Sequence, residues 1–480
     1  MREPAPMRGD DARTHAAGPR REVGSGGGPG VAAPVDGPGW DAIPPGPIAR
    51  ENAPDRRPAR PPEGLPLDQP QPIGALLARP QMWGFVATTA SIEFCRGALF
   101  MALLPAYLPA RLGFSVAAVG LVISAQYLAD GLFKIPAGWL VDRIGPWRVL
   151  LSFLGFSALA VYLLPHAHSL WAYVLLALLF GFGTSANWPA VLAGSVHLSG
   201  LASRASATSV TFLAWLAGGG LGPVLISFLV GRDSYRLAFA VLAGVVTLAP
   251  LAALIGWSGA LRDPRDPAWS ARIREESPED TVAALRANLR RSSWLIPGMF
   301  VQMLALGMLI PVLVPFTRQI LHLSQSQYGL LLLAGGSVTV LLLLPVGRLV
   351  DHVGSKTPLV IGFLLAGLAI LLVGHGGSEV GMLWRVGVLG LSYAFILPAW
   401  NSLTVGKIAE DRRGLLLGVF MAIEGFGQAI GPALGGWLYT HVGFRVPFQV
   451  VAAVMLIMLV FYLVMPARYF AAHGGKAIAR

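Results

Sequence analysis

The 480-residue chain has little charge and almost no cysteine. Only 13% of its residues are Asp, Glu, Lys or Arg, whereas an ordinary soluble chain carries about 25%. Hydrophobic residues make up 54%, and the mean hydropathy is +0.62. The one cysteine, Cys95, lies in an apolar segment, which excludes disulfides and cysteine-based metal sites. At about 20 apolar residues per span, this composition predicts about a dozen membrane helices.

Motifs on which enzymes depend are also missing. The sequence has no P-loop, no HExxH and no serine-elbow motif. The close histidine pair, His166 and His168, lies at the expected end of a helix, where solvation explains it better than metal binding. We therefore predict a protein that is not an enzyme and that uses no cofactor and no metal.

Positive charge is distributed unevenly, although the net charge is +11. Most arginines lie in the N-terminal tail or in loops that a single topology places on one side. Such a bias sets membrane orientation, so we do not expect a nucleic-acid site. An even number of spans then predicts an inner-membrane protein whose two termini and middle loop are all cytoplasmic.

Composition divides the chain into five parts. Residues 1–80 hold nearly half of the 37 prolines, which predicts a disordered cytoplasmic tail. Six-helix bundles are expected at 81–258 and 295–466. A cytoplasmic linker at 259–294 should contain a short amphipathic helix after Ser277 and Pro278, and 467–480 should be a cytoplasmic tail. The expected spans are 83–110, 115–140, 147–165, 169–192, 205–231, 235–258, 295–318, 325–350, 357–374, 380–401, 414–439 and 443–466.

The two bundles repeat each other at a constant offset of 209 residues (347 − 138). GWLVDRIG at 138–145 recurs as GRLVDHVG at 347–354. Proline, aspartate and arginine keep this offset across five helices, which chance does not produce. The further matches are Ser115 with Ser324, Pro136 with Pro345, Pro189 with Pro398, Arg204 with Arg413, and Pro223 with Pro432. Two parallel repeats predict an all-α membrane protein with twelve helices in two pseudo-symmetric six-helix bundles, binding substrate between them.

The segment from Gly138 to Leu150 resembles the loop motif between helices 2 and 3 of major facilitator transporters, and the resemblance extends over about residues 83 to 466. Its glycines allow a tight turn and close helix approach, while Asp142 can face a helix N-terminus across the interface between the halves. The motif is expected either to control the change between conformations or to have a purely structural role. Its residues are Gly138, Asp142, Arg143, Gly145 and Arg148, with Gly347, Asp351 and Gly354 in the second half.

A second segment, 427–436, is similar to the glycine-proline motif in helix 5 of antiporters of that superfamily. Here the fuller version falls in helix 11, and helix 5 keeps a shorter one. We interpret both as sites of close packing and kinking, with a coupling role as the alternative. The residues concerned are Gly218, Gly222, Pro223, Gly427, Gly431 and Pro432.

Four charged residues fall inside the first two expected helices. Glu93 and Arg96 are three residues apart, and Asp130 and Lys134 are four apart, so each pair shares a helix face. Helical rise places Glu93 near mid-bilayer and Asp130 within about a turn of that depth. Because ionisable residues in the bilayer are costly, we predict Glu93 or Asp130 as proton carrier and Arg96 as an anion or headgroup contact. The alternative is two self-neutralising pairs that fix packing.

The second half offers few polar groups in its expected helices 7, 8 and 10, where Gln302 and Asn401 stand out. Helix 11 adds Glu424 and Gln428. A cavity with one polar and one apolar wall suits an amphiphile better than a sugar. Further substrate or charge-pair candidates are Lys134, Asn187, Trp188, Trp215, Glu424 and Gln428.

A narrower resemblance agrees with this asymmetry. The segments 93–97 and 127–130 resemble the helix 1 and helix 2 signature of proton-coupled flippases for the glycolipid anchor of lipoteichoic acid. The resemblance implies that Glu93, Arg96 and Asp130 lie in the cavity and proton path, next to aromatic residues such as Trp188 and Trp215. This chain departs from it at Asp142, where that family has lysine.

The predicted function is proton-coupled transport of an amphiphilic or lipid-like substrate by alternating access. Drug or metabolite efflux by proton antiport is the main alternative, although the arginine that such antiporters carry in helix 4 is missing from 176–189. Uptake of an organic solute and a non-transporting sensor are further alternatives, and a sensor would need a folded soluble module. The expected partners are protons, membrane lipids and a small-molecule or lipid substrate, with the chain acting as a monomer.

Overall fold

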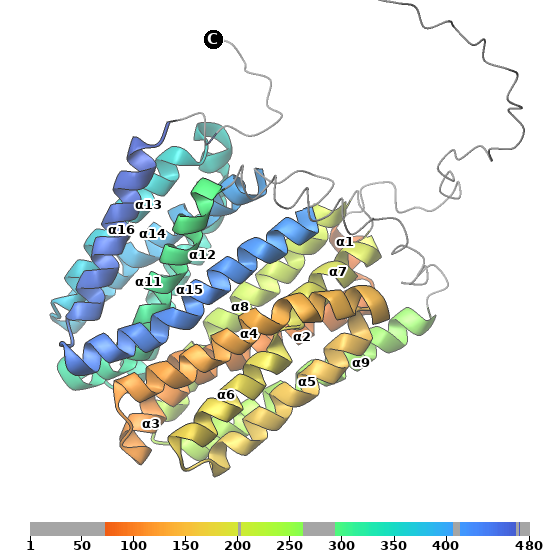
Figure 1. Ribbon diagram of the computed structural model, residues 1–480, viewed down its shortest axis with the longest axis horizontal. Helices are drawn as coiled ribbons and strands as arrows, with labels where there is room; N and C mark the ends of the chain where they lie inside the picture. The colour runs from red at the N-terminus through yellow and green to blue at the C-terminus, as the bar shows by residue number, and fades with distance from the viewer. Residues whose placement is uncertain (1–72, 200–202, 263–292, 407–412, 467–469, 471–480) are drawn as a thin grey trace, which may run out of the picture. The chain divides into compact units, whose positions relative to one another are not determined.

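The computed structural model describes residues 73–199, 203–262, 293–406, 413–466 and 470. Every regular element within these residues is a helix (Figure 1). This outcome confirms the predicted all-α fold class, and the arrangement agrees with twelve long helical segments in two bundles.

The first bundle begins with a short helix and continues with six long segments. Several of these combine two helices, since a π-helix at Ala98–Leu103 joins α2 to α3, and a turn separates α6 from α7. The bounds are α1 Ile73–Leu77, α2 Pro80–Gly97, α3 Leu104–Leu112, α4 Val116–Ile144, α5 Pro146–Leu163, α6 Leu170–Thr184, α7 Asn187–Ser199, α8 Arg204–Gly231 and α9 Tyr235–Arg262.

The second bundle has six long segments in the same order. Its helices are α11 Ile296–Pro315 with a π-helix at Phe316–Ile320, α12 Gln325–Val353, α13 Lys356–Gly374, α14 Glu379–Gly406, α15 Arg413–His441 and α16 Val446–Val464. Within the described residues, 11 segments are long and apolar enough to cross a membrane. The long helix α15 is not among them, and it carries Glu424 and Gln428.

The sequence repeat is a structural repeat. Helices α4 and α12 each contain 29 residues. Their N-caps, Ser115 and Ser324, both accept a hydrogen bond from the backbone N–H three residues later, at 3.2 Å. Both helices end at a glycine with positive φ, 87° at Gly145 and 78° at Gly354, where a side chain would be strained. Glycine therefore suits the backbone of this turn at both places.

Three boundaries differ from those expected. Residues 73–77 form α1, whose Leu76 is fully buried beside Met82, so the expected disorder does not extend to residue 80. An apolar side chain with a place to pack overrides the local proline bias. Helix α9 continues to Arg262, past the expected boundary at 258. Phe470, within the expected cytoplasmic tail at 467–480, packs against Tyr462 of α16. The expected linker helix after Ser277 lies outside the described residues.

Glycine permits close helix packing at equivalent places in both halves. A Cβ on Gly222 would lie 2.2 Å from the Phe94 carbonyl oxygen, and one on Gly431 would lie 2.4 Å from that of Leu304. The same holds for Gly218 against Ala90, at 2.3 Å, and for Gly427 against Phe300, at 2.3 Å. Helix α8 therefore lies directly on α2, and α15 on α11, as the packing interpretation predicts. The prolines of this motif, Pro223 and Pro432, lie inside α8 and α15.

The halves contact each other through α4 with α15 and through α8 with α12. They are especially close at one end, here called the closed end, where a Cβ on Gly120 would lie 2.3 Å from the Pro432 carbonyl oxygen. Hydrogen bonds between the halves reinforce this end: Ala117 N to Thr440 Oγ1 at 3.1 Å, Ala433 N to Ser124 Oγ at 2.8 Å, and Tyr328 OH to the Met101 carbonyl at 2.9 Å.

Candidate functional site

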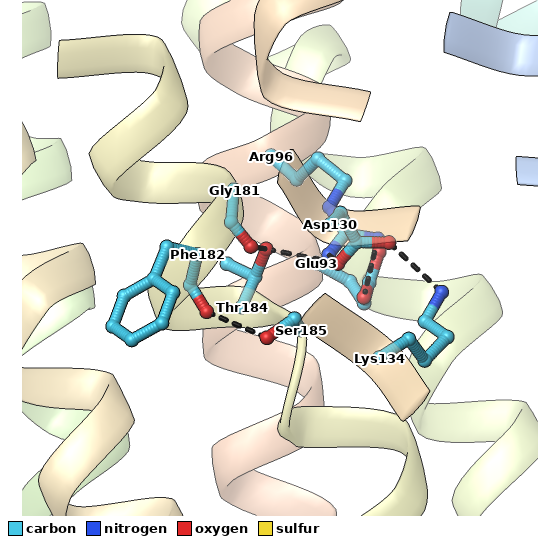
Figure 2. A network of polar contacts seen from close by, with 8 residues as sticks. All are labelled: Glu93, Arg96, Asp130, Lys134, Gly181, Phe182, Thr184 and Ser185. Carbon is cyan, nitrogen blue, oxygen red and sulfur yellow. Dashed lines mark hydrogen bonds and ion pairs between the residues drawn. The ribbon is translucent and has the colours of Figure 1, made fainter. Parts of the chain in front are cut away.

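Four charged side chains form a continuous network between α2 and α4 (Figure 2). Arg96 lies between two carboxylates, with Nη1 3.3 Å from Glu93 Oε1 and Nη2 3.0 Å from Asp130 Oδ1. Lys134 Nζ lies 2.8 Å from Asp130 Oδ2. The carboxylate side chains are 7% exposed and the two cations 16%. Two cations and two carboxylates therefore neutralise each other deep inside the first half.

Helical spacing explains how the chain assembles this network. Glu93 and Arg96 are at i and i+3 on α2, and Asp130 and Lys134 at i and i+4 on α4, so each pair meets on one face. The contact between Arg96 and Asp130 joins the two helices at one depth. The predicted proximity of the four residues is therefore present in the structure.

A third helix contributes a further hydrogen bond to Asp130. Thr184 Oγ1, at the end of α6, donates a hydrogen bond to Asp130 Oδ1 at 3.1 Å (Figure 2). The helix is interrupted immediately afterwards, because α6 ends at Thr184 and α7 begins at Asn187. Sequence reasoning missed Thr184 and expected one continuous span at 169–192. The one available signal was the Gly-Thr-Ser-Ala-Asn run at 183–187, which is rich in small polar residues.

The network borders a small cavity of about 60 Å³. Trp188 and Trp215 line it, so the structure places these predicted aromatic residues beside the charges. Asn187 also lines it, with its side chain 2% exposed and its Oδ1 without a hydrogen-bond partner. Drug-sized ligands occupy pockets of about 300–1,000 Å³. In this conformation the cavity has room for a polar group of a substrate or for water, but not for a whole amphiphile.

The second half contributes Met421 of α15 to the same cavity, a residue that sequence reasoning missed. Of the predicted residues on this side, Glu424 accepts a hydrogen bond from Trp400 Nε1 at 3.1 Å. Gln428 lies beside the hydroxyl of Tyr127 on α4. Neither side chain lines the cavity, so the charged network lies in the first half and Glu424 lies outside this network.

The other two polar residues noted in the second half differ in exposure. Gln302 is buried, and its Oε1 has no hydrogen-bond partner. Asn401 is exposed. The structure therefore brings neither of them to the charged network.

The loop motif lies at the ends of α4 and α12 that are opposite to the closed end. Asp142, Arg143 and Asp351 are exposed there, and the Arg143 guanidinium lies 4.0 Å from the ring centroid of Trp139. Gly138 and Gly347 have room for a Cβ, since the nearest atom is 3.8 Å away for Gly138 and none lies within 4 Å of Gly347. Close approach therefore does not explain these two glycines in this conformation, contrary to the prediction.

Arg148, the last member of the motif, is exposed near the start of α5. Its carbonyl accepts a hydrogen bond from Ser152 Oγ at 2.9 Å. The proposed contact of Asp142 with a helix N-terminus, and the gating role, stay predictions.

A larger hollow of about 410 Å³ lies along α4, α5 and α6, and its lining is entirely apolar. Leu132, Phe133 and Phe182 are among its lining residues, and Phe182 stacks on Phe153. No group in it can titrate or hold a charge. It is therefore a surface for hydrocarbon and not a site for chemistry.

Comparisons with known proteins agree with the fold. The family model of the Major Facilitator Superfamily matches residues 85–300 and again 295–478. The chain therefore belongs to the major facilitator superfamily.

Among relatives of known function, the chain is similar to the proton-coupled antiporter flippase LtaA of Staphylococcus aureus strain MSSA476. The two are 26% identical over 398 residues, which cover 80% of this chain and 94% of LtaA. LtaA of strain USA300 gives the same identity and coverage.

Two solved structures share the fold. The nucleoside transporter NupG superposes with a TM-score of 0.61 at 16% identity, covering 80% of this chain and 98% of NupG. A bacterial homologue of the human lysosomal transporter Spinster, in an inward-facing and unoccupied conformation, gives a TM-score of 0.62 at 16% identity, covering 81% of this chain and 95% of that one. These findings identify a multi-pass membrane transporter and not an enzyme.

Proposed function

We propose that this protein is a secondary active transporter that moves an amphiphilic or lipid-like substrate by alternating access and couples the movement to protons. The observation that carries the proposal is the network of Glu93, Arg96, Asp130 and Lys134, buried between α2 and α4 and open to a cavity at the boundary between the halves.

The arrangement of charges supports proton coupling. Arg96 is shared by Glu93 and Asp130, so protonating one of these carboxylates strengthens the hold of Arg96 on the other. Packing alone would be served as well by apolar side chains, because burying two ion pairs carries a desolvation penalty. We therefore assign the proton site to Glu93 or Asp130, with Arg96 and the unpartnered Asn187 Oδ1 available to a polar headgroup.

The contrast between the two walls of the cavity supports the proposed substrate class. The first half presents charges and two tryptophans to the cavity, and the second half presents Met421. An amphiphile can place its polar head against the first and its chain against the second. Similarity to a proton-coupled antiporter flippase supports the same assignment.

Orientation in the membrane is part of the proposal. The positive-inside bias supports an inner-membrane protein whose two termini are cytoplasmic. The loop motif would then face the cytoplasm, because it lies at the ends of α4 and α12 that are opposite to the closed end.

The test is flipping of a fluorescent glycolipid in proteoliposomes under an imposed pH gradient. The readout is the fraction of label that a membrane-impermeant quencher reaches. We expect gradient-dependent flipping by the native protein and its loss in Glu93→Gln or Asp130→Asn. The matched control is Glu379→Gln, which neutralises an exposed carboxylate bonded to Gln327 and should leave flipping unchanged.

Two outcomes would contradict the proposal in different ways. Absence of flipping above that of empty liposomes would exclude a lipid substrate, and a panel of soluble drugs and metabolites would then test efflux by proton antiport. Flipping that survives in both carboxylate variants would assign the network to packing.

A further inference from the structure

Glu424 is the one carboxylate that the described residues place well inside a helix of the second half, and the transport scheme above leaves it without a role. It lies on α15, which packs against α4, the helix that carries Asp130 and Lys134. Its Oε1 accepts a hydrogen bond from Trp400, which holds the carboxylate in place on its own half.

Helices α4 and α15 make a close backbone contact beside this carboxylate. A Cβ on Gly425 would lie 3.6 Å from Gly131 Cα, so the two backbones touch where these glycines face each other. Glu424 directly precedes Gly425, and Lys134 follows Gly131 by one turn. Met421, one turn before Gly425, lines the same cavity as Lys134. Lys134 and Glu424 therefore lie beside one helix crossing point, each on a different half. The positive charge of Lys134 acts electrostatically on the Glu424 carboxylate.

The two carboxylates near Lys134 respond differently to a movement of the halves. Asp130 and Lys134 lie on one helix, so their 2.8 Å contact survives a rigid-body movement of the halves. The separation of Lys134 from Glu424 changes with any rocking of α4 against α15. A four-carbon stem allows the ammonium to move from one carboxylate to the other.

The charge balance of the neighbouring groups indicates how the movement of Lys134 between the carboxylates is linked to a proton. Glu93, Asp130 and Glu424 are three carboxylates, and Arg96 and Lys134 are two cations. The set therefore carries one excess negative charge, which a single bound proton neutralises. The other titratable groups that face it are Tyr127 of α4 and Tyr393 of α14.

We propose that Glu424 is the positioning residue through which the second half responds to the proton. Lys134 bridges to Glu424 when a proton neutralises a carboxylate of the first half, and returns to Asp130 when the proton leaves. This inference rests on the proposed function for its purpose, but the exchange of Lys134 between the two carboxylates does not depend on what is transported.

The test is a double-mutant cycle on the melting temperature of the purified protein, which needs no substrate. Lys134→Gln, Glu424→Gln and the double variant are compared at neutral pH in the native chain and in Asp130→Asn, where the amide stands for the protonated carboxylate. In the Asp130→Asn background we expect the double variant to melt at a higher temperature than the sum of the two single losses predicts. The excess should be smaller in the native chain, where Lys134 is bonded to Asp130.

Two controls keep the result interpretable. The cycle of Lys134→Gln with Glu379→Gln should be additive in both backgrounds, because Glu379 is exposed and bonded to Gln327. Glu424→Asp should restore part of the coupling. Additivity of Lys134→Gln with Glu424→Gln in the Asp130→Asn background would overturn the inference, and so would a coupling of the same size in both backgrounds. Failure of lipid flipping would leave this result unaffected.

Discussion

The two halves have the same backbone plan and different interiors. In the first half, α8 lies on α2 through Gly218 and Gly222, and the face of α2 turned to the cavity carries Glu93 and Arg96. In the second, α15 lies on α11 through Gly427 and Gly431, and α11 offers Gln302 as its buried polar side chain. The comparison indicates that backbone packing was retained in both copies while the mid-membrane chemistry became asymmetric. Glycines that touch a carbonyl tolerate no side chain, whereas a cavity wall accepts any residue whose charge is compensated.

The largest expected effect concerns the chemistry that only the first half has. Arg96→Ala removes the cation between Glu93 and Asp130 and leaves buried charge uncompensated. Breaking a buried pair in this way costs about 3–5 kcal/mol. Arg111→Ala is the matched control, because its pair with Asp233 is exposed and such pairs contribute about 0–1 kcal/mol. Melting temperatures in detergent check the difference, and equal losses would contradict the burial argument.

The next effect tests the packing that both halves share. Gly222→Ala and Gly431→Ala place a methyl group 2.2 Å and 2.4 Å from a carbonyl oxygen, so the helices must separate. Overpacking of this kind costs about 1–3 kcal/mol, and we expect similar losses of melting temperature in the two halves. Gly220→Ala, with no atom within 4 Å of the added Cβ, should be neutral or slightly stabilising. A large loss in one half alone would show that packing too has become asymmetric.

A smaller effect is expected where the halves meet at the closed end. Tyr328→Phe removes the hydroxyl that donates to the Met101 carbonyl across the boundary. A hydrogen bond contributes about 0.5–1.5 kcal/mol, so the population of this conformation should fall a few-fold while the fold is retained. Spin labels on the exposed residues Arg232 and Val442 report the separation of the two halves at this end. A distance distribution identical to that of the native protein would exclude Tyr328 as a latch. Tyr162→Phe, which alters a bond within the first half, is the control.

Local spacing made part of the site predictable. The pairs Glu93–Arg96 and Asp130–Lys134 follow from helical periodicity, and their common depth follows from the rise per residue. Trp188 and Trp215 were expected beside the charges from family resemblance, and both line the cavity. Thr184 and Met421 were not predicted, because their roles depend on which helices lie next to α4. The helix break at Ser185 and Ala186 was missed for the same reason, since a run of small residues does not specify a break by itself.

The sequence by itself determined the class of protein, the number of helices, the repeat and the four charges inside the first half. These features are local or periodic, and they follow from apolar run length, residue offset and helical spacing. Only the tertiary structure decided which end of the halves is closed and that Thr184 donates a hydrogen bond to Asp130. It also decided that Gly131 contacts Gly425 next to Lys134 and Glu424. Such contacts join residues hundreds of positions apart, and they depend on packing angles between helices that no local pattern fixes.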